Sequence, residues 1–169
     1  MRKRVGIIGS NASIATEKQC EFAHKLGKLL VDNEFDIING GMGGIMEASA
    51  KGATESNNYD RASVIGFLPV IRYDLGNKFS GIQIISDIGS ARNRFIILNS
   101  IALIAIGGGA GTLNEISLAW ELGKPIAAYN NGGGWASKLA GQKIDDRRKD
   151  EIYSVIQPME VIDWLKGLK

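Results

Sequence analysis

Short apolar runs alternate along the chain with longer stretches in which apolar residues recur at helical spacing. The runs have the length of β-strands. They lie at residues 5–8, 35–38, 63–68, 82–86, 101–106, 125–129 and 152–156. The spacing of three or four residues between apolar positions elsewhere predicts helices. These cover residues 11–33, 45–53, 90–99, 111–123, 135–141 and 158–168. The alternation predicts an α/β fold, a doubly wound and mostly parallel sheet with helices on both faces.

Glycine-rich turns follow three of the expected strands. They are Gly9-Ser10, the stretch from Gly40 to Gly44, and Gly107-Gly108-Gly109-Ala110-Gly111. The carboxyl ends of parallel strands share one edge of the sheet, which is where doubly wound folds bind ligands. A glycine turn that leads into a helix presents N–H groups to an anion. The three turns therefore predict one site for a phosphate-bearing, nucleotide-like ligand.

Helix starts at the same edge carry the candidate reactive groups. Thr112 would bind phosphate oxygen or cap its helix, and Glu115, one turn further on, would face the ligand or complete a capping box with Thr112. Asn11 to Ser13 offer an N-cap for the first helix. Arg92 lies in the first turn of another helix, where a positive charge opposes the helix dipole. This placement favours a nearby anion.

The composition narrows the choice of partner and compartment. The 169 residues carry a formal net charge of +2, which argues against nucleic acid as a partner. No apolar run approaches the length of a membrane span. The single cysteine, Cys20, predicts a cytoplasmic protein without an internal disulfide, and His24 has no companions at metal-ligand spacing. No metal and no membrane partner is expected.

Two glycine turns resemble the signatures of a known family. The segment Gly107-Gly-Gly-Ala-Gly-Thr-Leu-Asn-Glu115 resembles the PGGxGTxxE motif of the LOG family. These are cytokinin riboside 5′-monophosphate phosphoribohydrolases, often mislabelled as lysine decarboxylases. The segment from Asn39 to Met46 resembles the GGGxxGLM turn of that family, and Arg92-Asn93 stands where the family has Arg-Lys. The resemblance covers nearly the whole chain and implies one Rossmann-like domain over residues 1–169.

Four departures place the chain nearer to a sister branch. Gly107 replaces the signature proline, Asn39 and Glu47 replace glycines, and Asn93 replaces the lysine. The pattern around Gly40 to Ala48 looks closer to proteins related to the molybdenum cofactor carrier protein. Proteins similar to the DNA-processing protein DprA are more distant relatives.

The resemblance implies two alternative functions. In the LOG family the Arg and Glu form the catalytic pair, which transfers to Arg92 and Glu115 and implies hydrolysis of the N-glycosidic bond of a nucleoside 5′-monophosphate. The sister branch implies instead a non-catalytic carrier for molybdenum cofactor or a related phosphorylated pterin. A homo-oligomer, dimer or tetramer, is expected in both cases. A pyridoxal-phosphate decarboxylase is rejected because no lysine lies near the turns, and no cofactor is expected. The expected ligand-binding residues are Gly9, Ser10, Gly40, Gly41, Gly43, Gly44, Asn93, Gly108, Gly109, Gly111 and Thr112.

Overall fold

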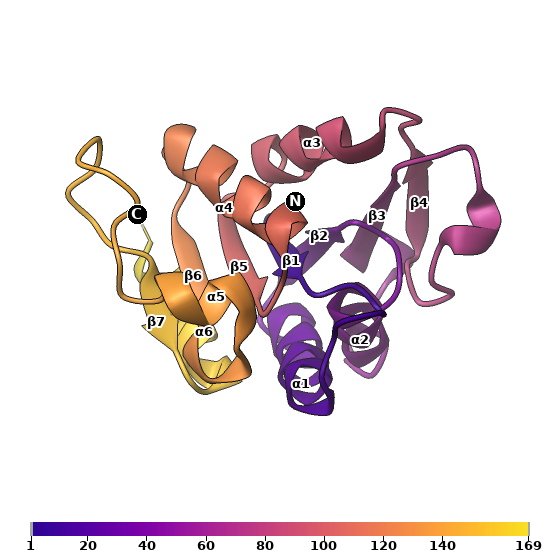
Figure 1. Cartoon of the computed structure of the whole chain (residues 1–169). Helices are drawn as coiled ribbons and strands as arrows, with labels where there is room; N and C mark the ends of the chain where they lie inside the picture. Colours follow the sequence, from indigo (N-terminus) through magenta and orange to yellow (C-terminus); the bar gives the residue numbers. More distant parts are fainter. Residues whose placement is uncertain (1, 169) are drawn as a thin grey trace.

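Seven parallel strands form one sheet in the order β4-β3-β2-β1-β5-β6-β7 (Figure 1). The structure is a computed structural model that describes residues 2–168. The strand order reverses between β1 and β5, the place where doubly wound folds open a ligand crevice. The strands are β1 (Lys3–Gly9), β2 (Phe35–Asn39), β3 (Val64–Leu68), β4 (Ile82–Ile85), β5 (Ala102–Ile106), β6 (Ile126–Tyr129) and β7 (Tyr153–Val155).

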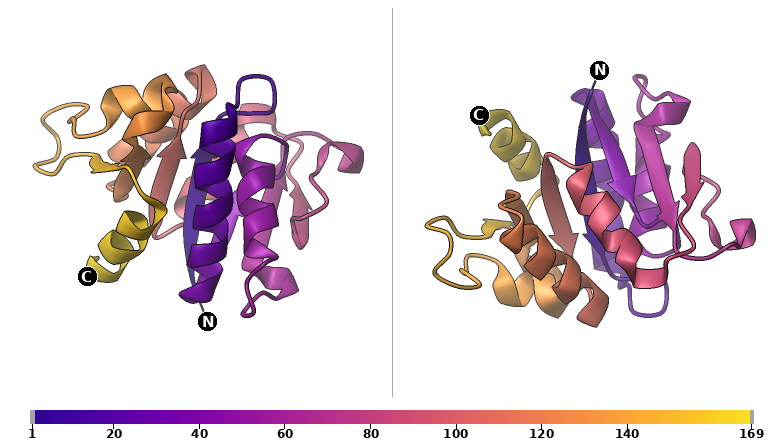
Figure 2. Two further views of the ribbon diagram at one scale, coloured as in Figure 1. Left: turned by 90° about the horizontal axis from the view of Figure 1, so that it is seen from below. Right: turned by 90° about the horizontal axis from the view of Figure 1, so that it is seen from above.

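Helices cover both faces of the sheet (Figure 2). One layer consists of α1 (Glu17–Asp32), α2 (Ile45–Ala53) and α6 (Pro158–Gly167). The opposite layer consists of α3 (Asn93–Leu98), α4 (Ala110–Glu121) and α5 (Gly134–Leu139). Short 3-10 turns lie at η1 (Arg61–Ser63), η2 (Tyr73–Leu75), η3 (Gly89–Arg92) and η4 (Asn130–Gly132). The doubly wound fold expected from the alternating pattern is confirmed, and all its strand pairings are parallel.

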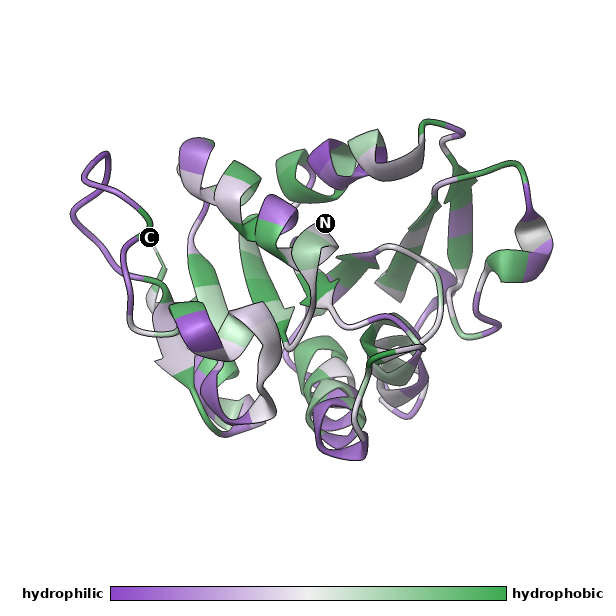
Figure 3. Ribbon diagram, in the orientation of Figure 1, coloured by the Kyte–Doolittle hydropathy of each residue, from purple (hydrophilic) through white to green (hydrophobic). Residues whose placement is uncertain are grey.

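The position of β5 at the centre of the sheet explains why its sequence is an unbroken apolar run. All five of its residues are buried. Ile104 and Ile106 pack beneath α1, α2 and α6, whereas Leu103 and Ala105 pack beneath α3 and α4. A strand covered on both faces needs apolar residues at every position. Figure 3 shows this concentration of hydrophobic residues in the central strands, with the polar residues gathered on the outer helix faces and loops.

Helix α1 begins later than expected. Its N-cap is Thr16, whose hydroxyl accepts the Gln19 N–H at 3.3 Å while the Gln19 carboxamide accepts the Thr16 N–H at 3.2 Å. This capping box outcompetes the expected cap at Asn11 to Ser13. Asn11 instead stabilises a local turn, since its side-chain oxygen accepts the Ser13 N–H at 3.0 Å. Residues 11–15 are therefore a loop between β1 and α1.

The helix starts near the site also differ from expectation. Residues 89–92 form the 3-10 turn η3, and only Asn93–Leu98 is α-helical. Helix α4 begins at Ala110, with Gly109 as N-cap and no side-chain cap. The alternative in which Thr112 and Glu115 form a capping box is therefore wrong, because Thr112 already lies inside the helix. Among residues 2–168, no helix combines the length and apolarity that crossing a membrane requires.

Candidate functional site

A cleft of about 440 Å³ opens where β1 and β5 end side by side. Gly9, the last residue of β1, pairs with Ile106 at the end of β5, so the first and third glycine turns are neighbours. The cleft therefore lies at the switch point of the sheet. Among residues 2–168, no lysine belongs to its lining. Its lining includes these residues expected from the sequence: Gly9, Gly40, Arg92, Asn93, Gly109, Gly111, Thr112 and Glu115.

Hydrogen bonds hold the third glycine turn in place. The Gly108 N–H donates to the Ser10 hydroxyl at 2.8 Å. The carbonyls of Gly107 and Gly108 accept N–H groups from Ala136 and Trp135 in α5, each at 3.0 Å. The turn is thus fixed to β1 on one side and to α5 on the other. This leaves its cleft-facing groups in a preorganised position.

The amino end of α4 forms one wall of the cleft. Its first intrahelical bond runs from the Leu113 N–H to the Gly109 carbonyl at 3.0 Å. The N–H groups of Ala110, Gly111 and Thr112 precede this bond, so they have no acceptor within the helix. All three residues line the cleft. These donors and the positive end of the helix dipole together favour an anion at this wall.

Arg92 connects two strand ends at the back of the cleft. Its guanidinium is buried and donates from one nitrogen to the carbonyls of Gly40 and Phe67. A Cβ on Gly40 would lie 2.8 Å from both terminal nitrogens of Arg92, so a glycine is needed at this position. Burial lowers the pKa of Arg92, and the carboxylate of Glu115 acts in the opposite direction. Arg92 therefore combines a structural contact with a positive charge in the cleft.

Glu115 faces Arg92 from α4. Burial raises the pKa of its carboxyl group to about 7, and the positive charge of Arg92 limits the rise. In the described part of the chain no ion pair joins the two groups, and no hydrogen bond involves the Glu115 carboxyl. Its oxygens are therefore available to a ligand. A carboxyl group with this pKa can exchange a proton near neutral pH.

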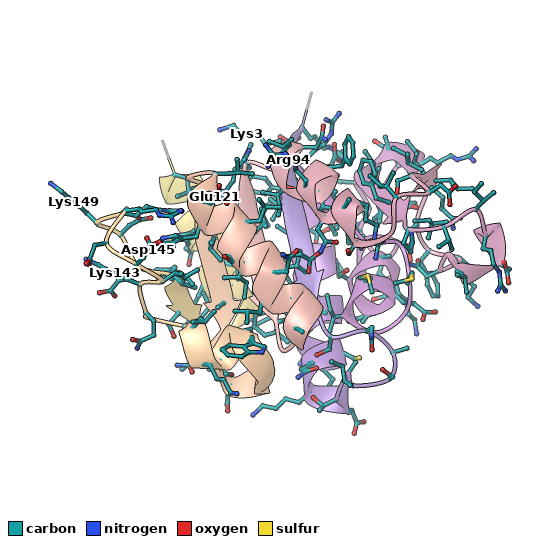
Figure 4. All side chains as sticks on the ribbon, turned by 45° about the horizontal axis from the view of Figure 1, so that its top comes forward. Lys3, Arg94, Glu121, Lys143, Asp145 and Lys149 are labelled. Carbon is teal, nitrogen blue, oxygen red and sulfur yellow. The ribbon has the colours of Figure 1, made fainter. Side chains whose placement is uncertain are left out.

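Asn93 and Thr112 complete this side of the site. Both side chains are buried and line the cleft. The Asn93 amide lies 3.4 Å from the side-chain oxygen of Asn114, which joins α3 to α4. Arg94 does not line the cleft; it is exposed on α3 (Figure 4).

Five of the expected ligand-binding residues are not part of the cleft lining. They are Ser10, Gly41, Gly43, Gly44 and Gly108. The Ser10 carbonyl accepts the Ile45 N–H at 3.1 Å, which joins the end of β1 to α2. Gly44 has a φ of +75°, and a Cβ there would lie 2.5 Å from the Ser10 carbonyl oxygen. These residues shape the site without lining it.

The cleft also contains residues that sequence reasoning missed. Most are apolar, and their pattern could not be distinguished from that of the core. Ile14 did carry a signal, because it is a single large apolar residue within the polar stretch 10–17. The missed lining residues are Ile7, Ile8, Asn11, Ile14, Met42, Met46, Gly89, Ser90 and Ala110.

The strand order and the cleft at the switch point define a Rossmann-like protein. Within this class, residues 2–162 match the model of the SLOG cluster4 family, and the chain belongs to that family. A protein of Archaeoglobus fulgidus without an assigned function is 42% identical over 125 residues, which are 74% of this chain and 78% of that protein.

Two solved structures connect the fold to known ligand-binding proteins. The molybdenum cofactor binding protein of the phototrophic bacterium Rippkaea orientalis is 25% identical, with a TM-score of 0.85 over 99% of this chain and 97% of that one. The molybdenum cofactor carrier protein of Chlamydomonas reinhardtii is 26% identical, with a TM-score of 0.81 over 98% of this chain and 97% of that one. The expected place of the chain, in a LOG-like Rossmann family near the molybdenum cofactor carriers, is confirmed.

Proposed function

We propose that this protein binds a phosphorylated, nucleotide-like or pterin-type ligand in the cleft, with the phosphate at the amino end of α4. The observation that carries the proposal is the wall of N–H groups at Ala110, Gly111 and Thr112, which have no acceptor within their helix and line the cleft. The buried positive charge of Arg92, which also lines the cleft, likewise favours a negatively charged ligand. The similarity to a molybdenum cofactor binding protein and a molybdenum cofactor carrier protein favours a ligand of the pterin class.

A second candidate function is hydrolysis of the ligand's N-glycosidic bond. The favouring observation is Glu115, a carboxyl group with a pKa of about 7 that has no hydrogen-bond partner among residues 2–168 and lines the cleft beside Arg92. In this reaction the bond from C1′ to the base nitrogen breaks, and water oxygen bonds to C1′. One water proton goes to the departing base, so the products are the free base and ribose 5-phosphate. The Glu115 carboxylate would stabilise positive charge on the ribose, and this requires its ionised form.

One assay separates the two functions. Nucleoside 5′-monophosphates are incubated with the wild-type protein and with Glu115→Gln, and free base is measured by chromatography. The hydrolase predicts release by the wild type that rises with pH through about 7 and is lost in Glu115→Gln. The control is Glu121→Gln, which removes an exposed carboxylate from the far end of α4 (Figure 4). Binding without release would support the carrier, whereas equal release by Glu115→Gln would exclude a catalytic role for this residue.

We also infer that two copies of the chain associate through the α3 face of β3 and β4. Phe95 of α3 stacks on Phe67 of β3, with ring centroids 6.3 Å apart, and remains 46% exposed. Ile82 and Ile84 of the edge strand β4 pair in register with Ile65 and Phe67 and are 37% and 39% exposed. Contiguous exposed apolar side chains are typical of an interface. A second copy offers a matching apolar surface by two-fold symmetry.

A further inference from the structure

Two loops and the start of α2 bring three apolar side chains to the cleft. The loop between β1 and α1 supplies Ile14, the segment that joins β2 to α2 supplies Met42, and α2 supplies Met46. The loops are in close contact, because a Cβ on Gly44 would lie 2.5 Å from the backbone carbon of Asn11. All three side chains line the same cleft.

Buried asparagine side chains fix the backbone that carries Met42 and Met46. The Asn77 amide donates to the carbonyls of Gly41 and Met42, both at 3.0 Å. The Asn39 amide donates to the Met46 carbonyl at 3.1 Å. Hydrogen bonds to buried amides restrict the backbone that carries Met42 and Met46. The main chain therefore holds both methionines at the cleft, while their unbranched side chains can adapt to a ligand.

Ile14 lies at the rim of the cleft, beside the amino end of α4. Its side chain is 51% exposed, and its Cδ1 would lie 3.7 Å from a Cβ built on Gly109, the N-cap of α4. The turn beneath it is closed by the Ala15 N–H, which donates to the Asn11 carbonyl at 2.9 Å. An isoleucine exposed to this degree at the rim of a cleft gains burial when an apolar group enters.

The lining of the cleft therefore combines two kinds of surface, polar groups and apolar side chains. The polar groups are the α4 N–H groups, Arg92 and Glu115. A sugar phosphate satisfies only the polar groups. A phosphorylated ligand with a flat heteroaromatic ring satisfies both, because ring faces pack well against aliphatic side chains and thioethers.

We propose that Ile14, Met42 and Met46 bind the flat ring of the ligand, and that Ile14 sets the preference for ring-bearing phosphates over sugar phosphates. This rests on the proposed phosphate site at α4. The ring-binding side chains come from the loop after β1, the loop after β2 and the start of α2, whereas the phosphate-binding groups are backbone N–H groups of α4. Substitution of Ile14 therefore changes affinity for the ring and leaves affinity for the phosphate unaltered.

Isothermal titration with guanosine 5′-monophosphate and ribose 5-phosphate tests this, since the two probes share the phosphate and sugar and differ by the base. For the wild type we expect the nucleotide to bind at least about tenfold more tightly than ribose 5-phosphate. Ile14→Ser should remove most of this difference, with ribose 5-phosphate binding changed less than about twofold. Met42→Gln, which keeps the side-chain length, should weaken the nucleotide selectively as well. The matched control is Ile156→Ser, which removes an isoleucine that is also 51% exposed and lies outside the cleft.

The outcomes are distinguishable. Equal binding of both probes by the wild type, or a nucleotide affinity that Ile14→Ser leaves unchanged, would overturn the ring-binding role while the phosphate site stands. Binding of neither probe would overturn the phosphate site and this inference with it. Unfolding temperatures of the variants, measured without ligand, show whether a loss of affinity comes from a loss of fold.

Discussion

Glu115 carries a charge that is sensitive to pH near neutrality. The pKa of its carboxyl is raised from 4.5 to about 7 because burial disfavours the ionised form. The folded state therefore holds this proton more tightly than the unfolded chain. Protonated Glu115 therefore contributes to the free energy of unfolding in full below pH 4.5, the pKa of the unfolded chain. This contribution is lost as the pH rises through about 7, the pKa in the folded state.

Glu115→Gln should therefore stabilise the protein at high pH only. At pH 8 the wild type carries the cost of an ionised, partly buried carboxylate, on the order of 3 kcal/mol, which glutamine avoids. Near pH 5 the gain should largely vanish, because the wild-type carboxyl is then protonated. Thermal unfolding at both pH values measures this. An equal gain at both pH values, or the same pattern in the control Glu121→Gln, would contradict a desolvated Glu115 with a raised pKa.

The elements around the site are joined by side chains more than by regular secondary structure. Arg92 joins η3 to the carboxyl ends of β2 and β3 through the carbonyls of Gly40 and Phe67. Ser10 joins β1 to the third glycine turn. Both bonds come from one terminal guanidinium nitrogen, which lies one bond further from the backbone than the ammonium nitrogen of a lysine would.

Arg92→Lys should consequently destabilise the fold by about 1–3 kcal/mol, since at least one buried carbonyl would lose its donor. Chemical denaturation gives this value directly. The control is Arg94→Lys, two residues along on the exposed surface of α3 (Figure 4), where a change within about 0.5 kcal/mol is expected. Equal effects of the two substitutions would show that the Arg92 contacts do not hold the strand ends.

The sequence predicted the elements better than their ends. The two-sided burial of β5 and the glycine turns required residues that are recognisable in a linear pattern, so the parallel sheet and its binding edge could be foreseen. The start of α1 could not, because Asn11, Ser13 and Thr16 are all good caps, and only the reciprocal bond with Gln19 decides between them. The hydrogen bond from the Gly108 N–H to the Ser10 hydroxyl could not be predicted, because it joins residues far apart in the chain.

At the scale of the whole molecule, one part of the sheet lacks a helical cover. The edge strand β4 (Figure 1) has no member among the buried core clusters, and its exposed Ile84 pairs with Phe67, on which Phe95 of α3 stacks. An uncovered apolar face next to an edge strand favours self-association. The cleft lies beside this face. Arg92 and Asn93 line the cleft, and they come just before Phe95 in the chain.

Light scattering at micromolar concentration should therefore give a mass that is a multiple of the 18.2 kDa chain. Phe95→Glu should shift the protein toward the monomer, because the charge would be buried at the interface. Met159→Glu, at a residue that is 49% exposed on α6, should leave the mass unchanged. A wild type that is monomeric would contradict the proposed interface.

The phosphate position at α4 is tested most directly by a charge placed at Gly111. A Cβ on this residue meets no atom within 4 Å, so aspartate and asparagine can both be accommodated there. Titration with guanosine 5′-monophosphate should give wild-type affinity for Gly111→Asn. It should give at least about tenfold weaker binding for Gly111→Asp, because the carboxylate repels the phosphate at close range. Equal affinities of the two variants would contradict a phosphate at the amino end of α4.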